Sequence, residues 1–104
     1  MNYKINYSNE AINDLIQIHD YIANVANEPK NANDLINDIR NAIKLLDTFP
    51  LRFHVVSFSP WKALNMRYFT IKNKIIFYLV NESNLTVTIV RIYSLKRDIN
   101  KIFK

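Results

Sequence analysis

The spacing of apolar residues changes near the middle of this 104-residue chain, and this change constrains the fold more than any other feature of the sequence. Up to residue 50, apolar side chains recur at the spacing of helices that bury one face. From residue 53 onward they alternate with polar residues or form short continuous runs, as they do in β-strands. A sheet covered by helices accommodates both patterns, so the sequence predicts an α+β fold.

The first half of the chain predicts one strand and two helices. Residues 3–7 alternate between apolar and polar side chains, which indicates a short, half-buried strand. Ser8 is suited to cap a first helix that reaches about residue 26. Pro29 fits the first turn of a second helix, and Pro50 ends it. The two helices are therefore expected to form an antiparallel hairpin.

The second half predicts strands followed by a short helix. The expected strands cover residues 53–58, 64–71, 74–80 and 85–93, and the expected helix covers residues 98–103. The predicted order is β-α-α-β-β-β with a short C-terminal helix, in which a helical hairpin packs on an antiparallel sheet. By length, we expect a single domain that covers residues 1–104.

Composition excludes several classes of site. The chain has no cysteine, which excludes disulfides and thiolate metal sites, and we expect neither a metal nor a cofactor. It has no glycine, which excludes glycine-rich phosphate loops and leaves Asn as the expected residue at left-handed turns. No apolar leader segment is visible, and the longest apolar run, residues 75–80, is too short to span a bilayer. We therefore expect a cytoplasmic protein without a membrane partner.

Charge is divided unevenly along the chain. Residues 1–50 carry four basic and seven acidic side chains, a net charge of −3. Residues 51–104 carry ten basic and two acidic side chains, a net charge of +8. The positive electrostatic field of residues 51–104 favours a nucleic acid or an acidic protein as the partner. The alternative is that the basic residues cluster by chance.

Several segments, in this order and spacing, resemble the RelE/ParE superfamily of bacterial toxins from type II toxin–antitoxin modules. They are Ile5–Ser8, Glu10-Ala11, Asp14-Leu15, Tyr21-Ile22, Phe49-Pro50, Met66–Tyr68, Lys74–Val80, Val87–Tyr93 and Lys96–Asp98. Members of this superfamily either cleave messenger RNA on the ribosome or inhibit DNA gyrase, and each is neutralised by an antitoxin. The resemblance therefore implies a cognate antitoxin as partner, and either gyrase or the ribosome with its mRNA as target.

Metal-free RNA cleavage needs a base for the 2′-hydroxyl, cations for the phosphorane and an acid for the leaving oxygen. Arginine can supply the cations, because it binds phosphate oxygens through two parallel hydrogen bonds. Tyr93, Lys96 and His54 are the candidates for proton transfer. The candidate catalytic residues are Arg67, Arg91, Tyr93 and Arg97. The candidate contacts to nucleic acid or to the target are Lys62, Lys74, Lys96 and Lys101.

One position favours the gyrase-directed, ParE-like branch of the superfamily. The ribonuclease branch usually carries arginine just before the apolar strand, where this chain has Lys74 and Ile75. The resemblance thus implies growth arrest through gyrase, with a ribosome-dependent mRNA endoribonuclease as the alternative. A non-toxic nucleic-acid-binding domain is a second alternative. We also expect a net acidic antitoxin segment to shield Arg67, Arg91 and Arg97.

The candidate residues also have structural interpretations. Arg91 could form a plain ion pair with Asp98 or Glu82. Trp61 either stacks on a base or, as the favoured alternative, packs over the sheet. His19 lies on the apolar stripe of the first predicted helix, which favours a hydrogen-bonded core residue over a metal ligand.

Overall fold

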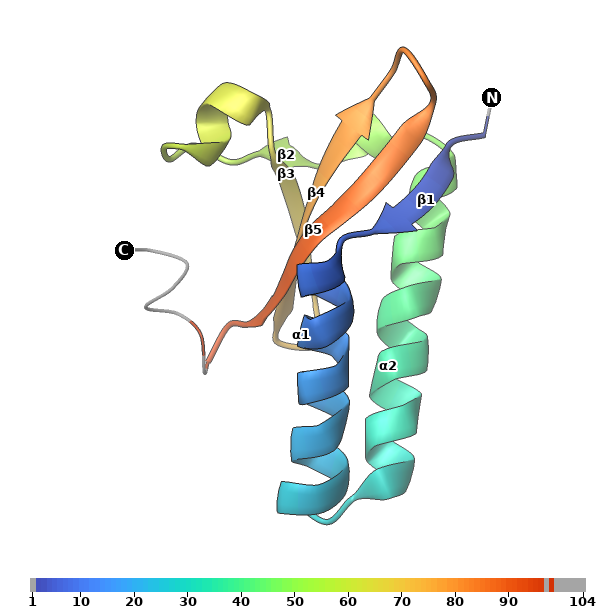
Figure 1. Ribbon diagram of the computed structural model, residues 1–104, viewed down its shortest axis with the longest axis vertical. Coiled ribbons are helices and arrows are strands. Elements are labelled where there is room, and N and C mark those ends of the chain that lie inside the picture. The colour runs from blue at the N-terminus through green and yellow to red at the C-terminus, as the bar shows by residue number, and fades with distance from the viewer. Residues whose placement is uncertain (1, 97, 99–104) are drawn as a thin grey trace.

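In the computed structural model, which describes residues 2–96 and residue 98, two helices pack on a five-stranded sheet (Figure 1). The strands are β1 (Lys4–Tyr7), β2 (His54–Val55), β3 (Arg67–Ile71), β4 (Lys74–Asn81) and β5 (Thr86–Ser94). The helices are α1 (Asn9–Asp20), which continues into a π-helical turn η1 (Tyr21–Val25), and α2 (Pro29–Lys44). Three short 3-10 turns complete the elements: η2 (Leu45–Asp47), η3 (Pro50–Arg52) and η4 (Trp61–Leu64). None of the described helices is long and apolar enough to cross a membrane.

The sheet has the strand order β1-β5-β4-β3-β2. The predicted α+β class is confirmed, and the order of helices and strands is roughly as predicted, with four strands after the hairpin where the predicted order has three. The sheet was expected to be antiparallel, but β1 runs parallel to β5, with Ile5 opposite Val87, so the sheet is mixed. Alternation within a segment identifies a strand but carries no information about its direction. Here the helical hairpin separates β1 from the remaining strands and lets β1 join the sheet beside the last of them.

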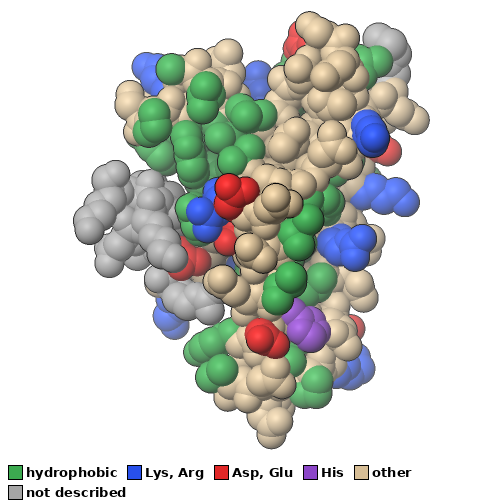
Figure 2. Space-filling view, viewed as in Figure 1, with side chains coloured by type: hydrophobic (Ala, Val, Ile, Leu, Met, Phe, Trp, Pro, Cys, Tyr) green, Lys and Arg blue, Asp and Glu red, His purple; other side chains and the backbone are tan. Residues whose placement is uncertain are grey.

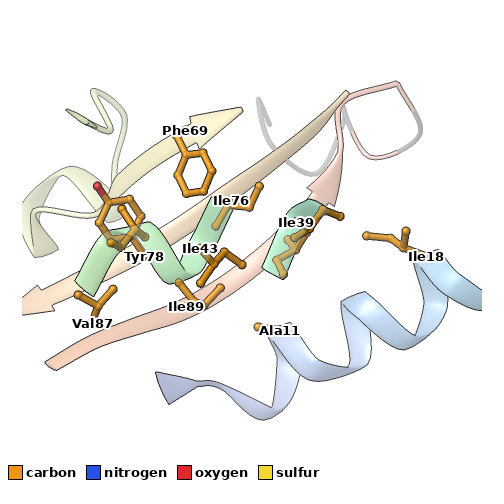
Figure 3. Close-up of a cluster of buried hydrophobic side chains, with 11 residues drawn as sticks. Ala11, Ile18, Ile39, Ile43, Phe69, Ile76, Tyr78, Val87 and Ile89 are labelled. Carbon is orange, nitrogen blue, oxygen red and sulfur yellow. The ribbon is translucent and has the colours of Figure 1, made fainter. Parts of the chain in front are cut away.

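The main core lies between the helical hairpin and the sheet (Figure 3). Its fully buried side chains come from α1, α2, η2 and three strands. They are Ala11, Ile18, Ile39, Ile43, Leu46, Phe69, Ile76, Tyr78, Val87, Ile89 and Ile92. Burying an aliphatic or aromatic side chain contributes about 1.5–3 kcal/mol, so this layer is the principal source of stability.

The opposite face of the sheet carries a second, smaller core. Val56, Met66, Ile75, Phe77 and Tyr93 are buried there. The segment that contains η4 covers this face, and the ring of Trp61 lies 4.5 Å from that of Phe77 in an edge-on arrangement. Trp61 therefore packs on the sheet. Because both faces are covered, β4 is buried at four consecutive positions from residue 75 to residue 78.

Several predicted boundaries differ from the structure. The second helix ends at Lys44 rather than near residue 50, because the η2 turn continues the apolar spacing and buries Leu46. The strand expected over residues 53–58 is only two residues long, since only β2 pairs with β3. The loop expected around Trp61 contains the η4 turn. The helix expected over residues 98–103 lies outside the described residues.

Left-handed backbone occurs at six described positions of this glycine-free chain. Three of them are Asn27, Asn65 and Asn73, as expected from the tolerance of asparagine for this conformation. The other three are Phe49, Lys72 and Leu85. A bulky residue in this conformation is uncommon and carries strain.

Candidate functional site

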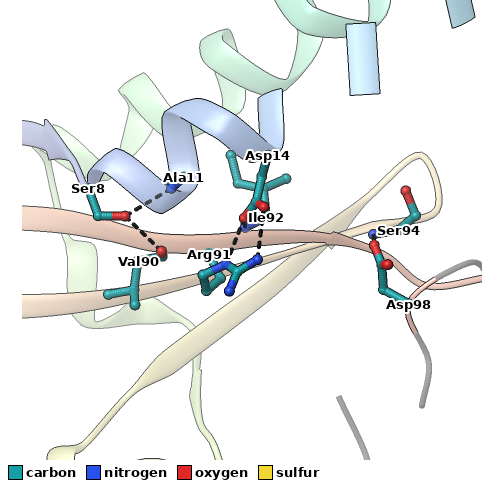
Figure 4. A network of polar contacts seen from close by, with 8 residues as sticks. All are labelled: Ser8, Ala11, Asp14, Val90, Arg91, Ile92, Ser94 and Asp98. Carbon is teal, nitrogen blue, oxygen red and sulfur yellow. Dashed lines mark hydrogen bonds and ion pairs between the residues drawn. The ribbon is translucent and has the colours of Figure 1, made fainter. Parts of the chain in front are cut away.

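An ion pair joins α1 to β5 (Figure 4). The Nε and Nη2 atoms of Arg91 each donate a hydrogen bond of 2.9 Å to the carboxylate of Asp14. The side chain of Asp14 is 9% exposed and that of Arg91 is 30% exposed. The hydrogen bonds that Arg91 donates to Asp14 raise the pKa of Arg91 above its ordinary value. The partners considered from the sequence, Asp98 and Glu82, are thus wrong, because packing of α1 on β5 brings in a carboxylate 77 residues away.

The position of Asp14 follows from the unequal lengths of two neighbouring strands. β1 ends before β5 does, so the edge of β5 beyond Ile89 has no adjacent strand. Ser8, the N-cap of α1, donates from its backbone to Ile89 and from its hydroxyl to the carbonyl of Val90. Asp14 accepts the backbone N–H of Ile92 at 2.9 Å. The start of α1 therefore replaces the missing strand and satisfies polar groups that burial would otherwise make costly.

A β-bulge determines which way the side chains of β5 point. Arg91 pairs with Phe77, whereas Ile89 pairs with the next residue of β4, which leaves Val90 as an extra residue. After the bulge, Arg91 and Tyr93 lie together on the face away from the helices. The guanidinium carbon of Arg91 lies 4.5 Å from the centre of the Tyr93 ring, a cation–π contact. The structure therefore brings these two candidate residues together.

Arg67 lies on the other face of the sheet. It is opposite Tyr78 in the β3–β4 register, and Tyr78 belongs to the core beneath the helices. Its Nη1 atom donates to the carbonyls of Leu51, at 3.1 Å, and Phe53, at 2.6 Å. The sheet therefore separates Arg67 from Arg91 and Tyr93.

The candidate lysines that the structure describes lie on different elements. Lys62 is exposed on η4, and Lys96 is exposed just after β5. Lys74 is partly buried at the start of β4. Arg97 and Lys101 lie outside the described residues.

Neither histidine has the surroundings of a catalytic group. His54 is exposed on β2, with its ring 6.4 Å from that of Tyr68. His19 bonds to the side-chain oxygen of Asn33 on α2 at 2.7 Å, but it is half-buried rather than part of the core. Among the described residues, no group of His, Asp and Glu side chains could hold a metal ion.

A polar cavity of about 210 Å³ lies beside the ion pair. Three carboxylates, those of Glu10, Asp14 and Asp98, line it together with Arg91 and Tyr93. Burial raises the pKa of Tyr93, opposed by the charge of Arg91. Its phenol is therefore protonated at neutral pH, and the surrounding carboxylates repel a phosphate group.

Residues 49–53, which we call the Phe49 loop, contain an arginine that the sequence reasoning missed. Arg52 donates through Nε to the carbonyl of Phe49 at 3.0 Å and through Nη2 to those of Leu45, at 2.9 Å, and Thr48. These bonds satisfy carbonyls left open where α2 and η2 end. The sequence signal is modest: a cation shortly after a helix C-terminus.

Asp14 was also missed as a site residue, although the sequence carries a signal for it. It lies between Ala11 and Ile18 on the stripe of α1 that faces the sheet. A carboxylate on a buried stripe requires a partner, because an isolated buried charge is strongly unfavourable. That requirement points to a cation on the sheet, but it does not identify Arg91.

An apolar groove runs along the helical hairpin on the face seen in Figure 2, where hydrophobic side chains gather between polar ones. It has a volume of about 480 Å³, and its apolar lining includes Ile12, Leu15, Ile16 and Ile36. Ile12 and Ile16 are 45% and 57% exposed. Exposed apolar surface of this kind suits a protein partner better than a nucleic acid.

A family model described as the ParE toxin of the type II toxin–antitoxin system parDE matches residues 5–99. The chain belongs to the ParE toxin family. The resemblance seen in the sequence, including its preference for the ParE-like branch, is thereby confirmed. No curated protein sequence matches this ParE-family chain.

Solved structures of toxin–antitoxin systems share the fold of this ParE-family protein. A chain of the chromosomal ParDE system from P. aeruginosa is 19% identical with a TM-score of 0.72, covering 88% of this chain and 95% of its own. A chain of the RelBE2 toxin–antitoxin complex from Mycobacterium tuberculosis is 17% identical with a TM-score of 0.61 and covers 90% and 92%. A chain of the archaeal RelE–RelB complex from Pyrococcus horikoshii OT3 is 16% identical with a TM-score of 0.58 and covers 93% and 99%. At these identities, the similarity establishes the fold.

Proposed function

We propose that this protein is the toxin of a type II toxin–antitoxin pair and that it arrests growth by binding and inhibiting DNA gyrase in the cytoplasm. In this proposal it cuts no bond and acts through its surface. The observation that carries the proposal is the engagement of Arg67 and Arg91 by internal partners on opposite faces of the sheet.

RNA cleavage would need cations that converge on one phosphate. Arg91 instead binds Asp14 in a cavity with two further carboxylates, and Arg67 binds backbone carbonyls. Ile75, at the position where the ribonuclease branch usually has arginine, is 5% exposed and lies opposite Tyr93 in the β4–β5 register. A buried aliphatic residue beside the candidate proton donor favours a protein-directed toxin.

The exposed surface also supports a protein target. The groove along the hairpin has apolar walls, and Tyr21 and Val25 extend the exposed apolar surface toward the tip of the hairpin. Lys62 and Lys96 are exposed and available for an acidic partner surface. The surface thus offers apolar contact along the hairpin and positive charge elsewhere, two features that give protein interfaces affinity and orientation.

We further propose that an antitoxin holds this toxin inactive. The family model describes toxins of toxin–antitoxin systems, and all three similar structures are titled as toxin–antitoxin systems or complexes. The net charge of +8 on residues 51–104 supports a net acidic antitoxin segment. Asp14 already neutralises the charge of Arg91. Of these two arginines, Arg67 is therefore the better binding site for such a segment.

Induced expression in a bacterial host tests the gyrase assignment. We expect growth arrest with filamentation and induction of the DNA-damage response, while incorporation of labelled amino acids continues at first. Primer extension on abundant messages should show no new ends. If incorporation stops within minutes and primer extension shows cuts at fixed codon positions, the protein is a ribosome-dependent ribonuclease and the gyrase assignment is wrong.

A further inference from the structure

The Phe49 loop presents an aromatic side chain to solvent from strained backbone. Phe49 has φ 51° and ψ 53°, and it is 81% exposed. The other bulky apolar residue with left-handed backbone, Leu85, is partly buried, and Lys72 is compensated by an ion pair with Asp38. At Phe49, neither burial of the side chain nor an ion pair offsets the backbone strain. Strain of this kind persists only where the surrounding structure enforces it, and it gathers at functional sites.

The surrounding structure does enforce it, from three directions. Arg52 binds the carbonyl of Phe49 itself, and Arg67 binds the carbonyls of Leu51 and Phe53. The hydroxyl of Tyr78, which is fully buried, donates to the carbonyl of Pro50 at 2.7 Å. All of these hydrogen bonds run to the backbone, so the loop backbone is held in place while the side chains of Phe49 and Leu51 remain exposed.

Exposed apolar side chains lie in this loop and close to it in the sequence. Leu45 is 62% exposed and Leu51 is 43% exposed, on either side of Phe49 in the sequence. A cavity of about 600 Å³ is lined by Tyr3, Thr48, Phe49, Pro50, Leu51 and Arg52. A hollow beside an exposed aromatic ring is shaped to accept one apolar side chain from a partner.

Positive charge flanks this surface. In the part of the chain that the structure describes, neither Arg52 nor Arg67 forms an ion pair with a carboxylate. Asp47 is close in sequence, but it forms no ion pair with either arginine. Self-association through this surface is disfavoured, because a two-fold contact would bring the same guanidinium groups together. The charge instead complements carboxylates.

We propose that the Phe49 loop is the docking site for an acidic segment of the antitoxin. Apolar side chains of that segment enter the cavity beside Phe49, and its carboxylates bind Arg52 and Arg67. The inference rests on the proposed antitoxin partner. It adds the position of the contact and the chemistry of the bound segment. Because the loop is held in place before binding, little ordering opposes the association.

Binding of the full-length protein encoded by the reading frame adjacent to this gene, labelled with a fluorophore, tests the proposal. Phe49→Asn removes the ring but keeps a residue suited to left-handed backbone, so the variant should unfold at the same temperature as the wild type or a higher one. We expect it to bind about 30-fold more weakly, the loss typical of one aromatic anchor. Arg52→Gln keeps an amide donor for the carbonyls and removes the charge, so the affinity should depend less on salt concentration.

The matched control is Val25→Asn. Val25 is 70% exposed and is the last residue of η1. The η1 segment lies at the tip of the helical hairpin, at the end opposite the Phe49 loop (Figure 1). Binding of this variant should stay within about twofold of wild type, since single exposed apolar residues outside an anchor contribute little. Unchanged antitoxin binding by Phe49→Asn would overturn the docking site. Loss of toxicity in that variant with antitoxin binding intact would assign the loop to the target instead. A wild-type protein that does not bind at all would overturn the antitoxin partner itself.

Discussion

Replacing Asp14 with alanine is expected to destabilise this protein strongly, although Asp14 is not one of the candidate catalytic residues. Its carboxylate accepts three hydrogen bonds of 2.9 Å, two from Arg91 and one from the backbone of Ile92. The substitution leaves a buried N–H without an acceptor and a half-buried guanidinium without a counter-charge. Both losses arise where α1 meets the edge of β5, so the contact between helix and sheet should weaken.

The size of the effect follows from these two losses. An unsatisfied buried N–H costs about 1–3 kcal/mol. Breaking a fully buried ion pair costs about 3–5 kcal/mol, and this upper bound must be reduced because the side chain of Arg91 is 30% exposed and water can solvate it. We therefore expect Asp14→Ala to lower the free energy of unfolding by about 3 kcal/mol, or Tm by roughly 10–20 °C. Asp14→Asn keeps an acceptor for Ile92 and should lose only about 1–2 kcal/mol.

Urea unfolding followed by circular dichroism, applied to a double-mutant cycle, measures the pair directly. Asp14→Ala, Arg91→Ala and the double variant should give a coupling energy of about 1–2 kcal/mol, because either change removes the same contact. The expectation from sequence that Arg91 serves a ligand predicts instead that Arg91→Ala is as stable as wild type. A coupling energy near zero, with Arg91→Ala fully stable, would refute the reasoning.

Three further predictions follow from charge and burial. Burial raises the pKa of Tyr78 to about 12, against an ordinary value of 10.0, so the unfolded chain loses this proton first and stability should fall as pH rises from 10 toward 12. Unfolding at a series of alkaline pH values, with Tyr78→Phe as the comparison, checks this, and equal pH dependence in both would contradict it. The double change Lys96→Ala with Arg97→Ala should relieve growth arrest on induction, since each lost charge-assisted hydrogen bond to a target removes about 1.5–3 kcal/mol. His54→Ala should leave toxicity intact, and growth curves that show the reverse would reassign these roles. The complex with the antitoxin should weaken as salt rises, and a titration that is flat up to molar salt would contradict its electrostatic part.

Local patterns were sufficient to predict the elements. Ser8 caps α1 as expected, accepting the N–H of Ala11 at 3.0 Å, and Pro29 begins α2. Asparagine occupies half of the left-handed positions in residues 2–96, as the absence of glycine predicts. Each of these features depends on a few neighbouring residues, and sequence reasoning is reliable at that range.

Features that depend on distant segments were not predicted. The bulge at Val90 changes which face each later residue of β5 occupies, and nothing in the local alternation marks it. The partner of Arg91 lies on the first helix, and the direction of β1 is set only when the sheet assembles. The register of β3, β4 and β5 places Arg67 and Arg91 on opposite faces of the sheet. The sequence alone does not show this separation.

The most direct test of the central claim is a supercoiling assay with purified DNA gyrase and purified toxin. We expect the protein to inhibit supercoiling of relaxed plasmid in a dose-dependent manner, and we expect prior addition of the antitoxin to abolish the inhibition. A parallel reaction with translating ribosomes should leave the message intact. Gyrase activity that stays unchanged at a large molar excess of toxin, together with messenger cleavage in the ribosomal reaction, would contradict the account.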